Sequence, residues 1–181
     1  MDEMSIEAKG RMEKSVESLR QSLVTLRTGR ANPAMLSSLM IDYYGEPTPV
    51  NQVSSITVPE PRQLLIKPYD KNDIKAIVAA INASDLGINP SNEGTQIRLT
   101  IPLLTEERRR DLSKQARKYG EEAKVSIRNI RRDYMDLLKE DDSMSEDYEK
   151  RVEEEIQKVT DEAIKNVDAV IAEKEKEIMA I

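Results

Sequence analysis

Seven Lys and Arg side chains recur along one side of the segment between residues 105 and 138. With successive residues about 100° apart, as in an α-helix, they fall between roughly 100° and 200° from Leu112. They are Arg110, Lys114, Arg117, Lys124, Arg128, Arg131 and Arg132. Glu106 and Glu121 interrupt them. Such a row of cations suits a polyanion, because the arginine fork binds phosphate through two nitrogens and lysine adds positive charge.

An apolar row in the same segment predicts where the helix packs. Eight apolar side chains fall between roughly −20° and +60° from Leu112 by the same arithmetic. They are Leu112, Ala116, Tyr119, Ala123, Ile127, Ile130, Tyr134 and Leu137. The sequence therefore predicts one helix over residues 105–138, with Thr105 as its N-cap, apolar on one face and cationic on the opposite one.

A solvated helix face is the alternative interpretation of these cations. Long helices carry Lys and Arg for solubility, and Arg117 with Glu121, or Lys118 with Glu122, has the spacing of an intrahelical ion pair. The one-sided clustering, and the use of Arg in place of Lys near the end of the segment, favour phosphate binding. Both interpretations stay open at this point.

Four residues outside this segment could also contact a ligand. Arg27 and Arg30 stand at the predicted end of the first helix. Stabilisation of a helix C-terminus by positive charge, about 0.3–1 kcal/mol, explains either Arg without requiring both. Tyr43 and Tyr44 precede Gly45, so they either stack on a base or a partner, or lead a strand into a turn.

Two further helices accompany the cationic one. Apolar residues in 4-3-4-3 spacing, from Met12 to Leu26, predict a helix over residues 5–28 that stops at Gly29. Ser145 is the expected N-cap of a third helix, whose apolar positions continue to Ile178. With only 3% aromatic residues, the three helices must bury their apolar faces on one another. We predict an antiparallel three-helix bundle.

Residues 31–104 differ in character and contain all eight prolines. Strands are expected at 39–43, 53–58, 64–67 and 96–101, a helix at 72–84, and turns at 44–47 and 59–61. The fold class is therefore α+β with two domains: residues 1–30 plus 105–181 form the bundle, and 31–104 form an inserted module. Hinges are expected near 30–31 and 103–105, at Arg30, Ala31, Leu103, Leu104 and Thr105.

Composition excludes several classes of site. The chain has no Cys and no His, which removes disulfides, thiolate metal sites and the commonest general base. It has no phosphate-binding Gly loop and no nucleophile elbow, so we expect no enzyme, no cofactor and no metal. No signal peptide and no run of about 18 apolar residues is visible, so we expect a cytoplasmic protein that does not contact membranes.

The net charge of −6 hides a segregation along the chain. Residues 105–132 carry a net charge of +5, and residues 133–181 carry −10. Acidic surface beside a cationic face would repel incorrect RNA sites. The main rival to RNA binding is a coiled-coil adaptor that binds protein partners through the acidic third helix, and a third class is a carboxylate-dependent enzyme.

Five segments, in this order, resemble the ribosome recycling factor family. They are residues 26–31 (Leu-Arg-Thr-Gly-Arg-Ala), 43–49 (Tyr-Tyr-Gly-Glu-Pro-Thr-Pro), 83–90 (Ala-Ser-Asp-Leu-Gly-Ile-Asn-Pro), 103–109 (Leu-Leu-Thr-Glu-Glu-Arg-Arg) and 125–133 (Val-Ser-Ile-Arg-Asn-Ile-Arg-Arg-Asp). The resemblance runs essentially from end to end, and five motifs in order make it highly specific.

The resemblance implies a three-helix bundle with an inserted β/α/β domain, L-shaped like a transfer RNA. It implies binding between the subunits of a post-termination ribosome, chiefly to large-subunit rRNA. With elongation factor G, which hydrolyses GTP, such proteins split the ribosome. The family's rRNA-contacting arginines match Arg27, Arg30, Arg128 and Arg131, and loss of Arg131 is expected to be most damaging. A monomeric, bacterial, cytosolic form is expected.

Overall fold

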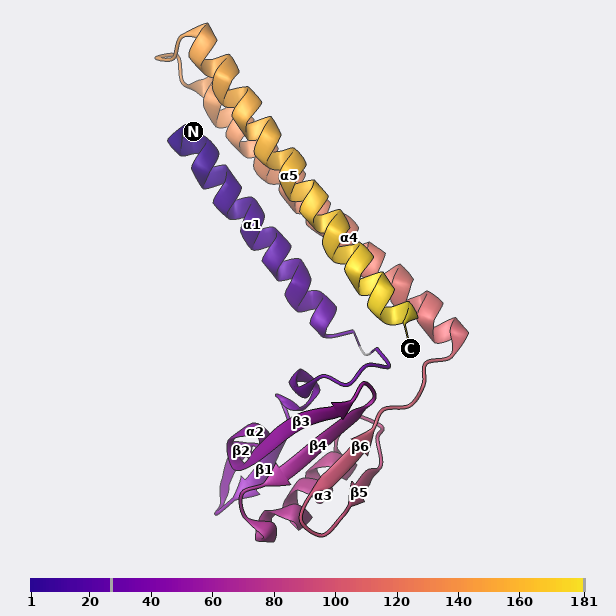
Figure 1. Cartoon of the computed structure of the whole chain (residues 1–181). Helices are drawn as coiled ribbons and strands as arrows, with labels where there is room; N and C mark the ends of the chain where they lie inside the picture. Colours follow the sequence, from indigo (N-terminus) through magenta and orange to yellow (C-terminus); the bar gives the residue numbers. More distant parts are fainter. Residues whose placement is uncertain (27, 181) are drawn as a thin grey trace. The chain divides into compact units, whose positions relative to one another are not determined.

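The computed structural model describes residues 1–26 and 28–180, which form two compact units (Figure 1). The first unit contains residues 1–26 and 106–180. The second unit contains residues 28–105 of the described chain. The long cationic segment and the acidic segment that follows it therefore belong to the same unit.

Three helices build the first unit. They are α1 (Glu3–Val24), α4 (Glu106–Glu140) and α5 (Glu146–Met179), and each contacts the other two. Helix α4 runs antiparallel to α1 and α5 (Figure 1). The predicted antiparallel three-helix bundle is confirmed. The predicted start of the cationic helix after Thr105 is also confirmed, and α4 continues two residues beyond the predicted end at Leu138.

Hydrogen-bonded caps define two of the helix starts. The Asp2 carboxylate accepts a hydrogen bond from Met4 N, and the predicted cap Ser145 accepts one from Tyr148 N. The predicted end of the first helix is wrong, because α1 stops at Val24. The Thr25 hydroxyl donates to the carbonyl of Ser22 at 2.6 Å and satisfies one of the last helical acceptors. Gly29 is therefore not the stop of this helix.

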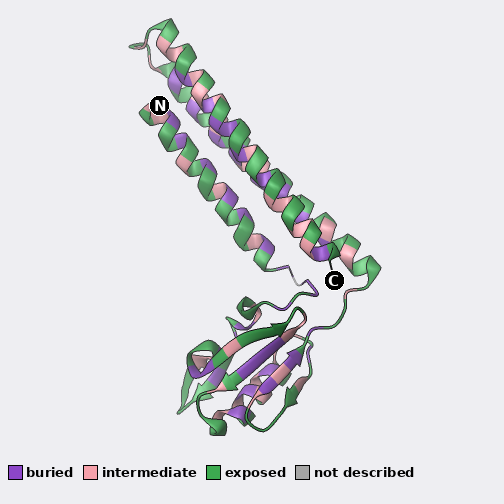
Figure 2. Ribbon diagram, in the orientation of Figure 1, coloured by how far each residue is buried: buried purple, intermediate pink, exposed green. Residues whose placement is uncertain are grey.

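The apolar faces of the three helices meet in a common core (Figure 2). The predicted seam of the first helix is confirmed, since all five residues are buried: Met12, Val16, Leu19, Leu23 and Leu26. On α4 two predictions are wrong, those for Leu137 and Tyr119. Leu137 is 50% exposed, and Leu138 is fully buried in its place. The helical wheel predicted that the residue three positions after Tyr134 is buried. In the structure the buried residue is the one four positions after Tyr134. Tyr119 is half-buried rather than core.

Gly120 allows α4 to approach α5 closely. A Cβ at this position would lie 2.8 Å from Cγ1 of Ile171. Gly10 on α1 is the matched case, because a Cβ there would meet nothing within 4 Å. The glycine at 120 is therefore required by packing, and the glycine at 10 is not.

This difference predicts opposite effects of the same substitution. Gly10→Ala should stabilise the bundle by about 0.5–1 kcal/mol through helix propensity. Gly120→Ala should destabilise it, because overpacking costs about 1–3 kcal/mol and exceeds that gain. Thermal unfolding followed by far-UV circular dichroism measures both. If Gly120→Ala raises the Tm as much as Gly10→Ala, the close packing against Ile171 is not a constraint.

One carboxylate ties the start of α1 to α5. Glu155 Oε2 accepts hydrogen bonds from Asp2 N at 2.9 Å and from the Ser5 hydroxyl at 2.8 Å. These donors lower the pKa of Glu155 below its ordinary value of 4.5, the Asp2 backbone bond contributing most. The Tyr148 hydroxyl donates to the Asp2 carboxylate and adds a second link.

The lowered pKa predicts how stability depends on pH. A carboxyl group whose pKa is lower in the folded state stabilises the protein above its unfolded pKa, and this contribution is lost as pH falls through the folded pKa. Glu155→Gln should therefore lower the Tm by a few degrees at pH 7. The difference from the wild type should shrink as the pH falls below 4.5. If the Tm difference between Glu155→Gln and the wild type is as large well below pH 4.5 as at pH 7, the lowered pKa of Glu155 does not stabilise the fold.

The second unit is an antiparallel sheet with a short hairpin, one longer helix and several short helical turns (Figure 1). Its strands are β1 (Met40–Tyr43), β2 (Glu46–Pro49), β3 (Ser54–Glu60), β4 (Gln63–Pro68), β5 (Pro90–Asn92) and β6 (Ile97–Thr100). Its helices are α2 (Val50–Val53), α3 (Ile74–Ala83) and the 3₁₀ turns η1 (Pro33–Leu36) and η2 (Lys71–Asp73). The sheet order is β3-β4-β6-β5, and β1 pairs only with β2.

The core of this unit lies between α3 and the central strands. Ile77 and Ile81 of α3 share one buried cluster with Leu64, Ile66 and Ile97 of the sheet. The predicted α+β module is confirmed, with its helix at 74–83 inside the predicted 72–84.

Four details of the second unit differ from the prediction. Strand β2 lies where only a turn was expected, because Pro47 and Pro49 hid an edge strand. Strand β5 and helix α2 were missed because each is very short. The expected turn at 59–61 falls at residues 61–62, because β3 continues to Glu60.

Candidate nucleic-acid interface

The seven cations of α4 divide into two rows by their position around the helix. The inner row, at roughly 100–140° from Leu112, lies beside the packed face. It consists of Arg117, Lys124 and Arg131, spaced seven residues apart. The outer row, at roughly 160–200°, consists of Arg110, Lys114, Arg128 and Arg132. The prediction that the cations oppose the apolar face is therefore wrong for the inner row, which flanks it.

Each residue of the inner row contacts α5. Lys124 Nζ lies 2.6 Å from Asp168 Oδ1. Arg117 Nε donates a hydrogen bond to the Glu175 carboxylate. Because α4 and α5 are antiparallel, the seven-residue step from 117 to 124 is matched by the step from 175 back to 168. The inner row therefore acts as an interhelical ladder.

The ladder changes the electrostatics of two cations. The hydrogen bond from Arg117 to Glu175 raises the pKa of Arg117, and the nearby negative charge adds to this effect. Hydrogen bonding to Asp168 raises the pKa of Lys124 in the same way, and burial opposes it only in part. Both cations stay charged at neutral pH, and each charge is compensated by a carboxylate of α5.

Arg131 has a different partner from the other two. Its Nε donates to the side-chain oxygen of Gln157 at 2.7 Å, and the Gln157 amide donates to Asp161 at 2.8 Å. The immediate partner is neutral, so the amide orients the guanidinium without compensating its charge. Arg131 also lines a hollow of about 500 Å³ between α4 and α5, whose charged lining residues are Arg131, Arg132, Asp136, Lys139, Glu153 and Glu154.

The outer row faces solvent. Within the part of the chain that the structure describes, the exposed side chains of Lys114 and Arg128 have no hydrogen-bond or ion-pair partner. Arg132 Nη2 donates to Asn129 Oδ1 at 3.0 Å. Arg110 lies 3.4 Å from Glu106, but the two side chains are 70% and 83% exposed, so this pair contributes little. The row is available to an external anion.

The intrahelical pairs that the spacing allowed are not the ones that form. Arg117 pairs with Glu175 rather than Glu121. Glu121 lies instead 3.7 Å from Lys124, three residues further along. A pair between Lys118 and Glu122 is absent from the described residues. Interhelical contacts prevail because the packed neighbour α5 presents its carboxylates on the same side.

The other predicted site residues are Arg27, Arg30 and the hinge residues, and none of them lies on α4. Arg27 lies outside the described residues. Arg30 is exposed and belongs to the second unit, so its place beside the cations of α4 stays a prediction. Ala31 is buried in the second unit, where its N donates to the Pro61 carbonyl at 2.7 Å. Leu103 is 60% exposed, Leu104 is half-buried and Thr105 is exposed.

Tyr43 and Tyr44 occupy the tip of the β1–β2 hairpin. Tyr44 has a φ of 51° and is followed by Gly45 at 87°, so the interpretation as a strand leading into a turn is confirmed. The two rings meet edge to face, with centroids 4.6 Å apart. Tyr44 is 85% exposed, and a role in stacking on a ligand stays a prediction.

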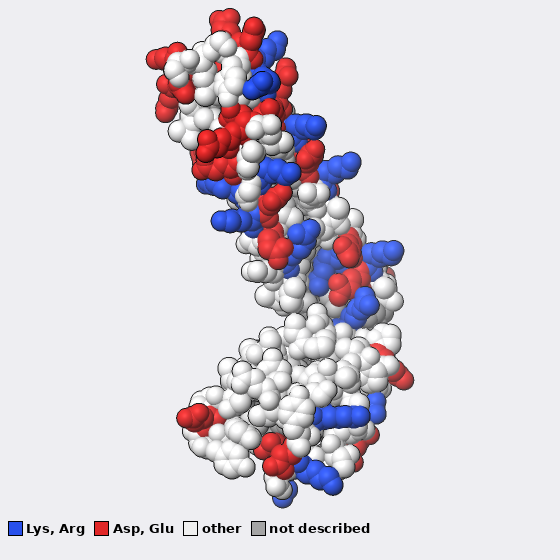
Figure 3. All heavy atoms as spheres, turned by 60° about the vertical axis from the view of Figure 1, so that its left-hand side comes forward, with Lys and Arg blue, Asp and Glu red and all other residues white. Residues whose placement is uncertain are grey.

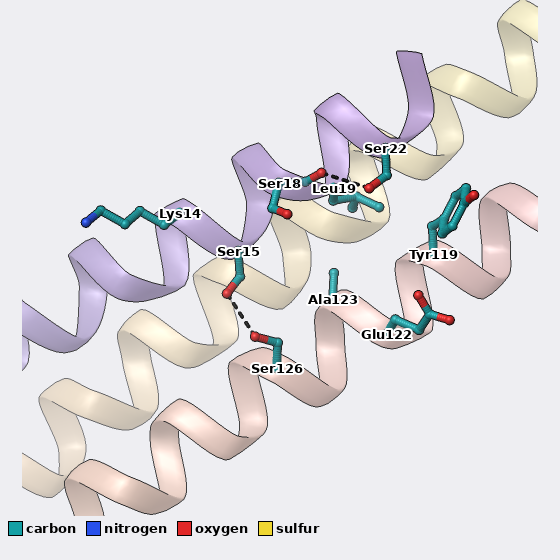
Figure 4. Close-up of a pocket in the computed structure, with 9 residues that line it drawn as sticks. All are labelled: Lys14, Ser15, Ser18, Leu19, Ser22, Tyr119, Glu122, Ala123 and Ser126. Atoms are coloured by element: carbon teal, nitrogen blue, oxygen red, sulfur yellow. Dashed lines mark hydrogen bonds between the residues drawn. The ribbon is translucent and has the colours of Figure 1, made fainter. Parts of the chain in front are cut away.

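A groove of about 320 Å³ lies between α1 and α4 (Figure 4). Its hydroxyl groups come from Ser15, Ser18, Ser22, Ser126 and Tyr119. The hydroxyls of Ser15 and Ser126 hydrogen-bond across it at 3.0 Å. Lys14 is the one cation among its lining residues, so this groove is not an extension of the cationic rows.

Basic and acidic side chains are interspersed over the face of the helical unit that Figure 3 shows. The segregation seen in the sequence is therefore local: a row of cations on α4 borders the carboxylates of α5. None of the described helices has the length and apolar character needed to cross a membrane.

Comparison with known proteins identifies the family. The sequence profile of the ribosome recycling factor family matches residues 19–179. The chain belongs to the ribosome recycling factor family. It is 52% identical to the ribosome-recycling factor of Staphylococcus carnosus, over the full length of both chains. It is 56% identical to that of Syntrophomonas wolfei, over 94% of each chain.

Solved structures of the family share the fold. A solution structure of a ribosome recycling factor matches with a TM-score of 0.78 at 40% identity, covering all of both chains. A second match has a TM-score of 0.64 at 49% identity and covers 98% of this chain and 97% of the other. It comes from models of the T. thermophilus ribosome recycling factor and the E. coli elongation factor G bound to the E. coli post-termination complex. The resemblance found in the sequence is confirmed, and the family is one of non-enzymatic translation factors.

Proposed function

We propose that this protein recycles ribosomes after termination, acting with elongation factor G to separate the subunits. Membership of the ribosome recycling factor family supports this function over a coiled-coil adaptor or a carboxylate-dependent enzyme. The protein makes and breaks no covalent bond. The energy comes from GTP hydrolysis by the partner.

The first unit binds the phosphates of large-subunit rRNA through α4. The observation that carries this proposal is the outer row, where Arg128 and Lys114 face solvent without an intramolecular partner in the described chain. Arg131 joins them, because the neutral Gln157 amide orients it and leaves its charge uncompensated. Arg27 and Arg30 are further candidates from the sequence. Charge-assisted contacts between guanidinium and phosphate provide the affinity.

The second unit receives the force applied by the translocase. Backbone hydrogen bonds from Ala31 to Pro61 and from Ile101 to Arg62 mark where its structure begins and ends. The sequence predicts hinges near 30–31 and 103–105. Because Ala31 is hydrogen-bonded within the second unit, we place the first hinge before it, at residues 28–30, and the second at residues 102–105. The tightly packed helices transmit the displacement of the second unit to the rRNA contacts.

Salt dependence of binding to large subunits tests the rRNA contact. If about four to six phosphates are neutralised, the logarithm of the association constant should fall against the logarithm of salt concentration with a slope near −3 to −5. Co-sedimentation with purified large subunits over a salt series measures this slope. A slope near zero would show that binding does not depend on phosphate contacts.

A further inference from the structure

The carboxylates of α5 are placed where an RNA phosphate would otherwise bind. Asp168 and Glu175 contact Lys124 and Arg117, the two cations of the inner row nearest the N-terminal end of α4. The side chain of Lys124 is only 18% exposed, so its ammonium group is held against the helix pair rather than extended into solvent. Arg117 is 69% exposed and Glu175 26%, so Glu175 occupies the Nε side of that guanidinium while the rest of it faces solvent. Each carboxylate thus occupies the position of an anion at the edge of the cationic rows.

An occupied cation contributes less to RNA binding than a free one. A phosphate that approaches Lys124 must displace Asp168 or share the ammonium with it, and the displaced carboxylate would then repel the RNA. The favourable release of counterions is also reduced, because the carboxylate already neutralises the cation. The outer row and Arg131 escape both effects, since no carboxylate of α5 contacts them directly within the described residues.

We propose that Asp168 and Glu175 restrict RNA binding on α4 to the outer row and Arg131 by occupying Lys124 and Arg117. The two carboxylates are thus specificity-determining residues. They lower the affinity for arbitrary RNA and favour a site whose phosphates match the remaining cations. This inference rests on the proposed function, because it assumes that α4 is the RNA-binding helix.

Neutral substitutions of the two carboxylates test the proposal. Asp168→Asn/Glu175→Gln keeps the shape of both side chains and frees two cations. Binding to a uridine homopolymer, a generic RNA, should strengthen about tenfold at low salt, and the salt slope should steepen by about 1–2. Glu162→Gln/Glu173→Gln is the matched control, since it changes the net charge equally on the same helix, and neither residue is ion-paired in the described chain. Far-UV circular dichroism verifies that each variant is folded.

A double-mutant cycle separates occupied cations from general charge effects. Arg117→Gln/Lys124→Gln should not strengthen binding to the homopolymer in the wild-type background, and any weakening there reflects repulsion by the two uncovered carboxylates. In the Asp168→Asn/Glu175→Gln background, the same change should remove the gain. The proposal is overturned if the control variant gains as much, if no gain appears, or if the gain survives loss of both cations.

Failure of this inference can be told apart from failure of the proposed function. If Arg128→Ala/Arg131→Ala abolishes binding to large subunits while Asp168→Asn/Glu175→Gln binds the homopolymer like the wild type, the function stands and the restriction is wrong. If neither variant alters binding to either RNA, α4 does not bind RNA, and both proposals are wrong.

Discussion

Binding to large ribosomal subunits should weaken by at least about 100-fold when Arg128 and Arg131 are both replaced by Ala. A hydrogen bond to a charged group contributes about 1.5–3 kcal/mol, so losing two such contacts removes about 3–6 kcal/mol. The exposed position of Arg128 and the orientation of Arg131 by Gln157 place both guanidiniums for such contacts. The salt slope of the variant should also be shallower by about 1.5–2.

The matched control removes two cations from outside the rows. Arg20 lies on α1 and Lys118 lies on α4 about 240° from Leu112, and both side chains are exposed. Arg20→Ala/Lys118→Ala should bind within about threefold of the wild type, because long-range charge alone has a small effect at physiological salt. If the control weakens binding as much as Arg128→Ala/Arg131→Ala, net charge rather than the cationic rows determines the affinity.

Lengthening both linkers should uncouple binding from subunit splitting. Insertion of Gly-Gly-Ser after Gly29 and after Leu103 lies outside the hydrogen bonds that begin and end the second unit at Ala31 and Ile101. Binding to large subunits should stay within about twofold, whereas the rate of splitting should fall about tenfold or more, because a Gly/Ser linker behaves as a flexible coil and does not transmit displacement.

A second insertion controls for the added residues themselves. Gly-Gly-Ser after Gly94, in the exposed turn between β5 and β6, leaves both linkers unchanged. This variant should split ribosomes at a rate close to that of the wild type. Equal rates for the wild type and the lengthened-linker variant would show that the linkers do not carry force.

Periodicity predicted the helical unit well and the second unit less completely. The seam from Met12 to Leu26 and the cap at Ser145 follow from local spacing and hydrogen bonding, and both are present. The end of α1 was misplaced because a Thr hydroxyl ended the helix before the glycine. Strand β2 was not predicted because Pro47 and Pro49 lack the backbone N–H that a strand paired on both sides needs. An edge strand such as β2 tolerates them.

The candidate interface was predicted as a set of cations, but not as two rows. A single helix wheel treats every position outside the apolar face as facing solvent alone, whereas Arg117, Lys124 and Arg131 each contact a side chain of α5. One signal in the sequence could have indicated this. The seven-residue spacing of these cations is repeated by Asp161, Asp168 and Glu175, as expected for facing positions in a packed helix pair.

Light scattering by post-termination ribosomes tests the central claim most directly. Mixed with this protein, elongation factor G and GTP, the ribosomes should lose scattering as the subunits separate, and neither factor alone should produce the change. Arg128→Ala/Arg131→Ala should abolish the loss, and Arg20→Ala/Lys118→Ala should retain it. Undiminished splitting by the Arg128→Ala/Arg131→Ala variant would contradict the account that cations on α4 hold the protein to the ribosome.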